Sequence, residues 1–278
     1  MVEQGGPGSL FVVSTPIGNM GDFSFRAVET LRAVAVVLAE DTRHSRPLLE
    51  HYEVRTPLLA YHEHNEARMS PQVVARIAGG DDVALISDAG TPLLSDPGAR
   101  LVRAAVESGL RVVPVPGASA LLAALVASGM DADRFTYFGF LERKGRSRGE
   151  VVAEVAALRH TAILYEAPSR VAGTLAELAA AGGGTRPAAV LRELTKLYEE
   201  VRRGTVAELA AYYGESPPRG EVVIVVAGGT AGTPTDDVLR ETARALRSDG
   251  MSARDVAKAL GAAGAARNLA YKLAHEGE

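Results

Sequence analysis

The 278-residue sequence contains no cysteine, and this absence excludes several kinds of chemistry. Disulfide bonds, a thiolate nucleophile, and zinc or iron–sulfur sites held by cysteine are all ruled out. No run of about eighteen uncharged apolar residues occurs, so no membrane-spanning segment is predicted. Met1–Ser9 is glycine-rich and has no basic stretch followed by an apolar one, so we expect a short flexible tail rather than a signal peptide. A cytoplasmic protein is the resulting expectation.

The usual nucleotide-binding motifs are also missing. The chain has no Walker A sequence, and no predicted strand is followed by G-x-G-x-x-G, so a nucleotide-like ligand would not be bound by the common Rossmann turn. Positive charge is not in excess either. The formal net charge of −4 argues against a protein that coats nucleic acid indiscriminately, but it is compatible with a local basic patch. The length suits one large or two medium α/β domains.

Short apolar runs rich in valine and isoleucine recur along the chain, and most are apolar on both faces. Such runs are typical of strands buried on both sides of a sheet. They are Leu10–Ser14, Val34–Ala39, Val83–Ser87, Val112–Val115, Phe135–Phe140, Ala162–Tyr165, Ala188–Leu191 and Val222–Ala227. Amphipathic segments with a helical period separate them: Phe25–Ala33, Glu66–Ala78, Ala99–Ser108, Ala120–Ser128, Arg148–Leu158, Val171–Ala181 and Val206–Tyr213. This alternation predicts mostly parallel sheets covered by helices.

Two segments interrupt the alternation. Leu141–Gly149 is basic and poor in apolar residues, which predicts an exposed loop, and Gly228–Pro234 has the composition of a linker. Only helical patterns follow the linker. A helix is predicted to start at the capping-box spacing within Ser252–Leu260, and a second one over Ala266–His275. Two short helices across a glycine turn indicate a helix-turn-helix, with a small helical cap without a binding role as the alternative.

Three turns rich in glycine and proline follow three of the predicted strands. They are Ser14–Asn19, Ser87–Pro92 and Val115–Ala120. In open α/β sheets, ligands bind outside the carboxyl ends of the strands. Glycine lets a ligand approach the backbone, and proline fixes the turn. Each turn alone is most simply a tight connection, but the three together favour a ligand cleft.

Eight short motifs occur in order between about Leu10 and Gly228. They are Thr15–Asn19, Ala39–His44, His62–Glu66, Ser87–Pro92, Val113–Gly117, Tyr165–Glu166, Arg192–Lys196 and Arg219–Glu221. In this order the motifs resemble those of the ribosomal RNA small subunit methyltransferase I family, within the tetrapyrrole-methylase superfamily. The resemblance implies an α/β, two-domain tetrapyrrole-methylase fold with a small C-terminal helical extension. We expect a tail (residues 1–9), two α/β domains (10–117 and 118–229), and a linker with a helical tail (230–278).

The activity implied by this resemblance is methylation of the ribose 2′-hydroxyl of a cytidine in the decoding region of 16S rRNA. S-adenosyl-L-methionine would be the methyl donor, held in the cleft between the two domains, and the protein would be a homodimer. Because the net charge is negative, we expect the assembled small ribosomal subunit, rather than free RNA, to be the substrate.

Other functions stay open from the sequence. Within the superfamily the closest alternative is a methyltransferase acting on a tetrapyrrole, a corrin precursor, but a small macrocycle needs neither the basic loop nor the helical tail. A non-catalytic RNA-binding assembly factor would suit both of these features, although it would not need three Gly/Pro turns around one cleft. A DNA-binding regulator would make the order of the motifs a coincidence.

The resemblance also assigns cofactor-binding positions, motif by motif. They are Pro16, Asp88, Ala89, Gly90, Thr91, Pro116, Gly117, Ser119, Tyr165, Glu166, Gly220 and Glu221. Such turns have a physical rationale, because backbone amides and carbonyls at strand ends can bind adenine and a zwitterionic methionine without formal charge.

A weak nucleophile such as a ribose hydroxyl benefits from a base, and the sequence offers several candidates. Glu40, Asp41 and His64 are the candidate bases, and Lys196 is either catalytic or paired with Glu193. The alternative for Asp41 is a helix N-cap with a solvated salt bridge. Methyl transfer needs no metal, so none is expected at the histidine pair of the His62–Glu66 motif.

Cationic side chains supply the candidate RNA contacts. Arg43 is a candidate clamp for phosphate, since a guanidinium binds phosphate oxygens in a bidentate manner. The basic loop and the helical tail provide the others. The candidate RNA-binding residues are Arg43, Arg143, Lys144, Arg146, Arg148, Arg267, Asn268 and Lys272.

Overall fold

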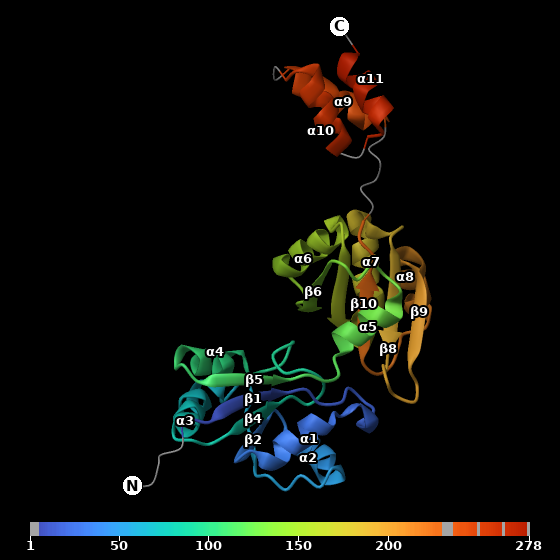
Figure 1. Cartoon of the computed structure of the whole chain (residues 1–278). Helices are drawn as coiled ribbons and strands as arrows, with labels where there is room; N and C mark the ends of the chain where they lie inside the picture. The colour runs from blue at the N-terminus through green and yellow to red at the C-terminus, as the bar shows by residue number, and fades with distance from the viewer. Residues whose placement is uncertain (1–5, 230–235, 249–250, 263–264, 277–278) are drawn as a thin grey trace.

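The computed structural model describes residues 6–229, 236–248, 251–262 and 265–276, which form two α/β halves followed by three helices (Figure 1). Most of the expected tail and most of the expected linker, residues 1–5 and 230–234, lie outside the described residues. No helix among the described residues is long and apolar enough to cross a membrane.

The first sheet is parallel throughout and has the strand order β3-β2-β4-β1-β5. Its strands are β1 (Ser9–Val13), β2 (Val36–Ala39), β3 (Leu58–Ala60), β4 (Val83–Ile86) and β5 (Arg111–Val115). Every residue of β2 and β4 is buried, as expected for central strands covered on both faces. Two helices pack on each face: α1 (Phe25–Ala33) and α2 (Thr42–His51) on one, α3 (Glu66–Ala78) and α4 (Ala99–Glu107) on the other.

The second sheet has the order β6-β7-β10-β8-β9 and is mixed. Its strands are β6 (Phe135–Phe140), β7 (Thr161–Glu166), β8 (Pro187–Arg192), β9 (Glu200–Thr205) and β10 (Val222–Val226). Only β6 and β7 pair in parallel, so the expectation of mostly parallel strands is wrong for this sheet. No crossover helix separates β8 from β9, and β10 inserts between β7 and β8 in the opposite direction.

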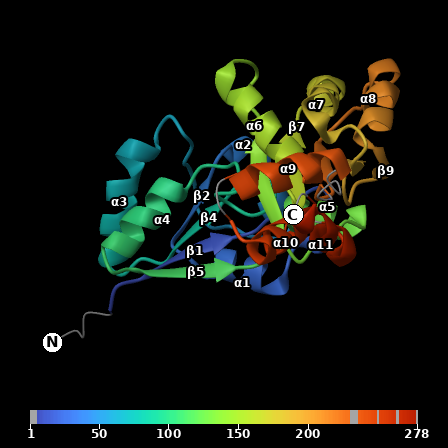
Figure 2. The ribbon, with the colours of Figure 1, turned by 90° about the horizontal axis from the view of Figure 1, so that it is seen from above.

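Four helices cover the second sheet. α6 (Arg146–Ala157), α7 (Val171–Leu178) and α8 (Val206–Glu215) lie side by side on one face, where they share a core with the sheet (Figure 2). α5 (Ala120–Ser128) packs on the other face. Short helical turns lie at Met20–Asp22, Pro168–Arg170 and Ala179–Gly183.

The C-terminal helices form a small unit with a core of its own. They are α9 (Asp236–Ser248), α10 (Ala253–Ala262) and α11 (Arg267–His275). Leu239, Val256 and Leu273 contribute to that core, one from each helix. The predicted start of α10 is confirmed, because the hydroxyl of Ser252 accepts a hydrogen bond from the backbone N–H of Asp255 at 3.2 Å.

Candidate functional site

The three glycine- and proline-rich turns meet at one edge of the first sheet. Thr15 and Gly90 exchange two backbone hydrogen bonds, with N···O distances of 2.8 and 3.1 Å. The hydroxyl of Thr91 lies 2.9 Å from that of Ser14 and donates to the carbonyl of Ala118 at 3.2 Å. Each turn is therefore held by the other two, and their backbones form one continuous rim.

Two glycines are required where these turns approach one another. Gly90 has a φ of 77°, in the left-handed region, and a Cβ there would lie 3.2 Å from Cγ2 of Ile17. A Cβ on Gly117 would lie 3.0 Å from Cβ of Ser14, tighter than side chains tolerate without a shift. The glycines thus allow the rim to close while leaving space in front of it.

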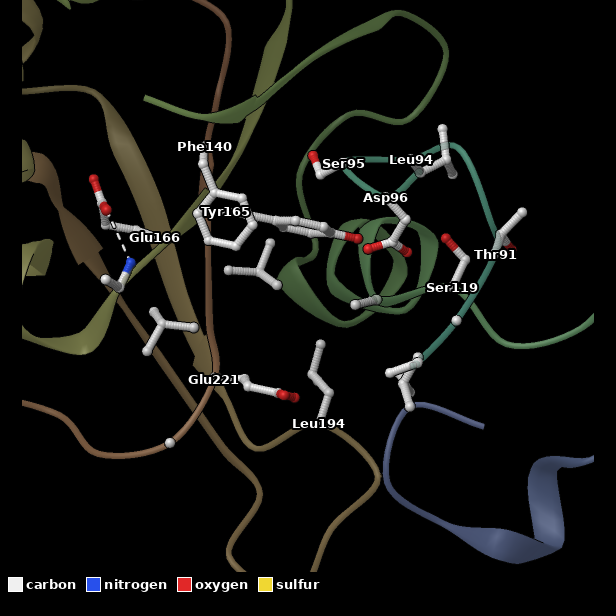
Figure 3. Close-up of a pocket in the computed structure, with 18 of the residues that line it drawn as sticks. Thr91, Leu94, Ser95, Asp96, Ser119, Phe140, Tyr165, Glu166, Leu194 and Glu221 are labelled. Atoms are coloured by element: carbon white, nitrogen blue, oxygen red, sulfur yellow. Dashed lines mark hydrogen bonds between the residues drawn. The ribbon is translucent and has the colours of Figure 1, made fainter. Parts of the chain in front are cut away.

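That space is a cavity of about 270 Å³ between the two sheets (Figure 3). The first half of the chain contributes the turns and the loop that follows β4, and the second half contributes the ends of β6, β7, β8 and β10. The lining residues are Ile17, Ala89, Gly90, Thr91, Leu94, Ser95, Asp96, Ser119, Ala120, Phe140, Tyr165, Glu166, Ala167, Pro168, Leu194, Gly220, Glu221, Val222 and Val223. Eight of the predicted cofactor positions, from both halves of the chain, thus line this one cavity.

An aromatic wall closes one side of the cavity. The ring of Tyr165 meets those of Tyr137 and Phe140 edge to face, with centroids 5.0 and 5.5 Å apart. Its hydroxyl accepts a hydrogen bond from the backbone N–H of Leu121 at 3.1 Å. Burial, with a smaller contribution from Tyr137, raises the pKa of Tyr165, so the phenol stays protonated and neutral.

Sequence reasoning missed one acidic residue of the cavity, Asp96. Burial, followed by the negative charge of Glu40, raises the pKa of Asp96 to about 6, and Asp88 adds to the effect. The loop that carries Asp96 is strained, because Leu93 and Ser95 have φ angles of 76° and 68°. No spacing in the sequence reports these backbone angles, and the recognised motif ends before the loop.

A second hollow, of about 440 Å³, adjoins the first and shares Ile17, Ala89 and Glu221 with it. Unlike the cavity, it has the cationic side chains of Arg43 and Lys196 in its wall, together with His44. Its remaining lining residues are Pro16, Gly18, Met20, Ser45, Pro47, Leu48, Ser87 and Asp88. Two predicted cofactor positions, Pro16 and Asp88, therefore lie here rather than in the cavity. Pro116 and Gly117 line neither space and support the rim from behind.

Asp41 has the structural role that was the alternative to a catalytic base, a helix N-cap with a solvated salt bridge. It is the N-cap of α2, and its carboxylate accepts hydrogen bonds from the backbone N–H of Arg43 at 2.8 Å and from its guanidinium at 2.7 Å. These bonds hold the pKa of Asp41 far below its ordinary value. A carboxylate that is occupied in this way is a poor proton acceptor.

The other candidate bases differ in position. Burial, then Asp88, raises the pKa of Glu40, while His62 lowers it. His64 is exposed, and its ring centroid lies 5.9 Å from that of His62. The ammonium of Lys196 is paired with Glu193 at 2.9 Å and with Glu221 at 3.0 Å, so it joins two loops of the second half.

Arg148 is not the exposed RNA contact that the basic loop predicted. It is buried in α6, where it donates to Glu177 at 2.8 Å, to Thr174 at 2.8 Å and to the carbonyl of Glu142 at 2.9 Å. The predicted loop ends early because α6 begins at Arg146, and the helical period turns Arg148 inward. The other cations of the loop, Arg143, Lys144 and Arg146, are exposed.

Glu166 belongs to the same buried network. Its carboxylate accepts hydrogen bonds from Arg170 at 2.6 Å, from Thr174 at 2.6 Å and from the backbone N–H of Ala167 at 2.8 Å. Figure 3 shows the carboxylate turned to Ala167, away from the cavity. The residue therefore shapes the cavity wall and offers no free charge to a ligand.

The predicted RNA-binding residues of the tail lie on the surface of the C-terminal unit. Arg267, Asn268 and Lys272 are all exposed on α11. Arg267 and Asn268 line a shallow hollow between α10 and α11 together with Lys258 and Tyr271. This arrangement places a cationic groove on the helix pair.

The chain is similar to known proteins in sequence and in fold. The profile of the family Tetrapyrrole (Corrin/Porphyrin) Methylases matches residues 9–210. The chain is 43% identical to the ribosomal RNA small subunit methyltransferase I of Synechocystis sp. over 91% of this chain and 92% of that one. Its identity to the protein of the same name from Xylella fastidiosa is 50%, over 80% and 82%.

Solved structures show the same fold. A uroporphyrin-III-C-methyltransferase from Thermus thermophilus superposes with a TM-score of 0.56 at 22% identity, over 79% of this chain and 94% of that one. The predicted tetrapyrrole-methylase fold is thus confirmed. On the family profile and the curated relatives together, the chain belongs to the tetrapyrrole methylase family and, within it, to the ribosomal RNA small subunit methyltransferase I family.

Proposed function

We propose that this protein transfers the methyl group of S-adenosylmethionine to the RNA of the small ribosomal subunit. The observation that carries the proposal is the similarity, over most of both chains, to relatives named for that reaction. The finer assignment, the ribose 2′-hydroxyl of a cytidine in the decoding region of 16S rRNA, comes from the resemblance of the eight motifs.

The cavity fits the donor. Its aromatic wall at Tyr165 and the apolar side chains of Leu94 and Leu194 suit an adenine ring, and the backbone groups of the rim suit the polar methionine end. When bound, the donor supplies an electrophilic methyl group on a cationic sulfur. The side chains of the cavity would orient it and exclude water, and the second hollow lies next to it, sharing Ile17, Ala89 and Glu221.

The second hollow suits the acceptor nucleotide. It adjoins the cavity, which is required because methyl transfer needs donor and acceptor in line and in contact. Arg43 offers positive charge for phosphate, and Arg43 and His44 offer hydrogen-bond donors in its wall. Glu40 lines neither space, but it is the base candidate that fits best, because burial and Asp88 raise its pKa and an ionised carboxylate with a raised pKa is a stronger base.

Exposed cations on two parts of the chain suit a large RNA surface. Arg143, Lys144 and Arg146 lie at the start of α6, and the groove on α11 carries Arg267. A corrin precursor would make no use of these positions. The acidic net charge supports a folded ribosomal surface, where a few phosphates are contacted, over extended free RNA.

A homodimer with a cytoplasmic location is part of the proposal. Leu122 and Val126 on α5 are 51% and 80% exposed, although α5 is apolar on every side. A helix of this composition is normally buried all round, so a second copy of the chain is the natural cover for this face.

The test is methylation of purified 16S rRNA and of assembled small subunits with a radiolabelled donor. We expect label in a single ribose of the assembled subunit and a much lower rate on naked RNA. If a corrin precursor offered in the same assay is labelled and RNA is not, the proposal is wrong and the protein is a tetrapyrrole methyltransferase. Binding of subunits without any transfer would favour the assembly factor.

A further inference from the structure

The cavity between the two sheets has an unbalanced charge. Among its described lining residues there are three carboxylates and no lysine, arginine or histidine. Two of the carboxylates are paired with cations: Glu166 with Arg170 at 2.5 Å, and Glu221 with Lys196 at 3.0 Å, which Glu221 shares with Glu193. Within the part of the chain that the structure describes, the third carboxylate, Asp96, has no cationic partner.

Asp96 also faces the space that a ligand would fill. Its carboxylate projects between Ser119 and the hydroxyl end of Tyr165, on the cavity side of the loop (Figure 3). The negative charges of Glu40 and Asp88 act on it and raise its pKa. A cation that enters the cavity would therefore meet a mostly apolar wall with one uncompensated negative group, where water screens the attraction weakly.

The donor and the product of methyl transfer differ in this charge. The bond between the methyl carbon and sulfur breaks, and its electron pair stays on sulfur. The carbon bonds to the acceptor oxygen, whose proton passes to a base, for which Glu40 is the candidate, or to water. The sulfur is a sulfonium cation before the step and a neutral thioether after it. A carboxylate beside the sulfur would stabilise the first state and not the second.

We propose that Asp96 is the specificity-determining residue by which the cavity prefers the cationic donor to its neutral product. This inference rests on the proposed function, because it takes S-adenosylmethionine as the ligand. The attraction is present on donor binding and disappears with the transfer, so the product is held less tightly and leaves. Only an interaction that differs between donor and product can change the ratio of their affinities. The charge of Asp96 is such an interaction, because only the donor carries a positive charge on sulfur.

The experiment is calorimetric titration of the full chain with S-adenosylmethionine and with S-adenosylhomocysteine. In Asp96→Asn, which keeps the shape and removes the charge, we expect the preference for the donor to fall about tenfold, mostly through weaker donor binding. Asp96→Glu should retain part of the preference. Glu107→Gln, on the exposed end of α4, removes one charge outside the cavity and should leave the preference unchanged.

A pH series separates a charge effect from a structural one. Glu40 and Asp88 raise the pKa of Asp96, and Tyr137 and Tyr165 face it while neutral. In the wild type the preference for the donor should grow between about pH 5 and pH 7, as Asp96 ionises, and it should be flat in Asp96→Asn. Retained binding of the product would show that this variant is folded.

The opposite results are equally clear. If Asp96→Asn weakens donor and product by the same factor, or changes neither, the inference is wrong while the proposed function stands. If the wild type binds neither ligand in the presence or absence of small subunits, the proposed function fails and the inference fails with it.

Discussion

The hydroxyl groups of Ser95 and Tyr137 lie 2.7 Å apart and join the strained loop after β4 to β6 of the second sheet. This hydrogen bond holds the segment that carries Asp96 against the aromatic wall. We predict that Tyr137→Phe weakens donor binding about threefold to tenfold, the range expected for one hydrogen bond of about 1 kcal/mol. Calorimetry measures the affinity, and faster amide exchange at residues 93–96 would report the loosened loop. Tyr271→Phe, on the exposed α11, should change neither quantity.

Because its pKa is raised, ionised Asp96 lowers the free energy of unfolding at neutral pH. Its pKa lies near 6 in the folded protein, above the ordinary value of 3.8, so folding favours the protonated form. The contribution of protonated Asp96 to the free energy of unfolding is fully present below about pH 4 and is lost as the pH rises through about 6. Urea unfolding should therefore show Asp96→Asn gaining stability over the wild type between pH 4.5 and pH 7.5. A difference that does not vary with pH would contradict this assignment.

Gly90 combines a backbone requirement with a steric one, and Gly109 shares only the first. Their φ angles are 77° and 69°, but a Cβ at Gly109 meets nothing within 4 Å. Alanine at either position should cost about 1 kcal/mol of stability because of the left-handed backbone. Only Gly90→Ala should also weaken donor binding, since its Cβ would press on Ile17 in the cavity wall. If the two variants bind the donor with equal affinity, the turn at Gly90 is not part of the binding site.

Arg148 and Arg146 lie two residues apart on α6 and should behave in opposite ways. The side chain of Arg148 is 8% exposed and bonded to Glu177, whereas that of Arg146 is 93% exposed. Arg148→Ala should lower the free energy of unfolding by about 3 kcal/mol, because it leaves buried acceptors without their donor.

Arg146→Ala should instead leave unfolding unchanged and weaken binding to small subunits, with a shallower salt dependence because fewer phosphates are neutralised. Denaturant unfolding measures the stability of both variants, and binding to small subunits at two salt concentrations measures their affinity. A stable Arg148→Ala protein with impaired subunit binding would reverse the structural assignment.

Most elements of the fold could be predicted from the sequence, and the misses have physical causes. The apolar runs located eight of the ten strands among the described residues, because these strands are mostly apolar along their length. β9 was missed because Glu200–Thr205 lies at the sheet edge and alternates polar residues. α2 was missed because Pro47 and a run of polar residues hide its period, although its N-cap at Asp41 had been considered.

The sequence by itself determined which chemistry is excluded and which turns have the glycines that the site requires. The lack of cysteine rules out thiol chemistry in any fold, and glycine at positions such as Gly90 is a local requirement of the backbone. Only the tertiary structure decided which charges are free. Arg148 is neutralised inside a helix pair, while Asp96 faces the cavity without a cationic partner among the described residues. Burial and pairing depend on residues far apart in the chain, so no local pattern can report them.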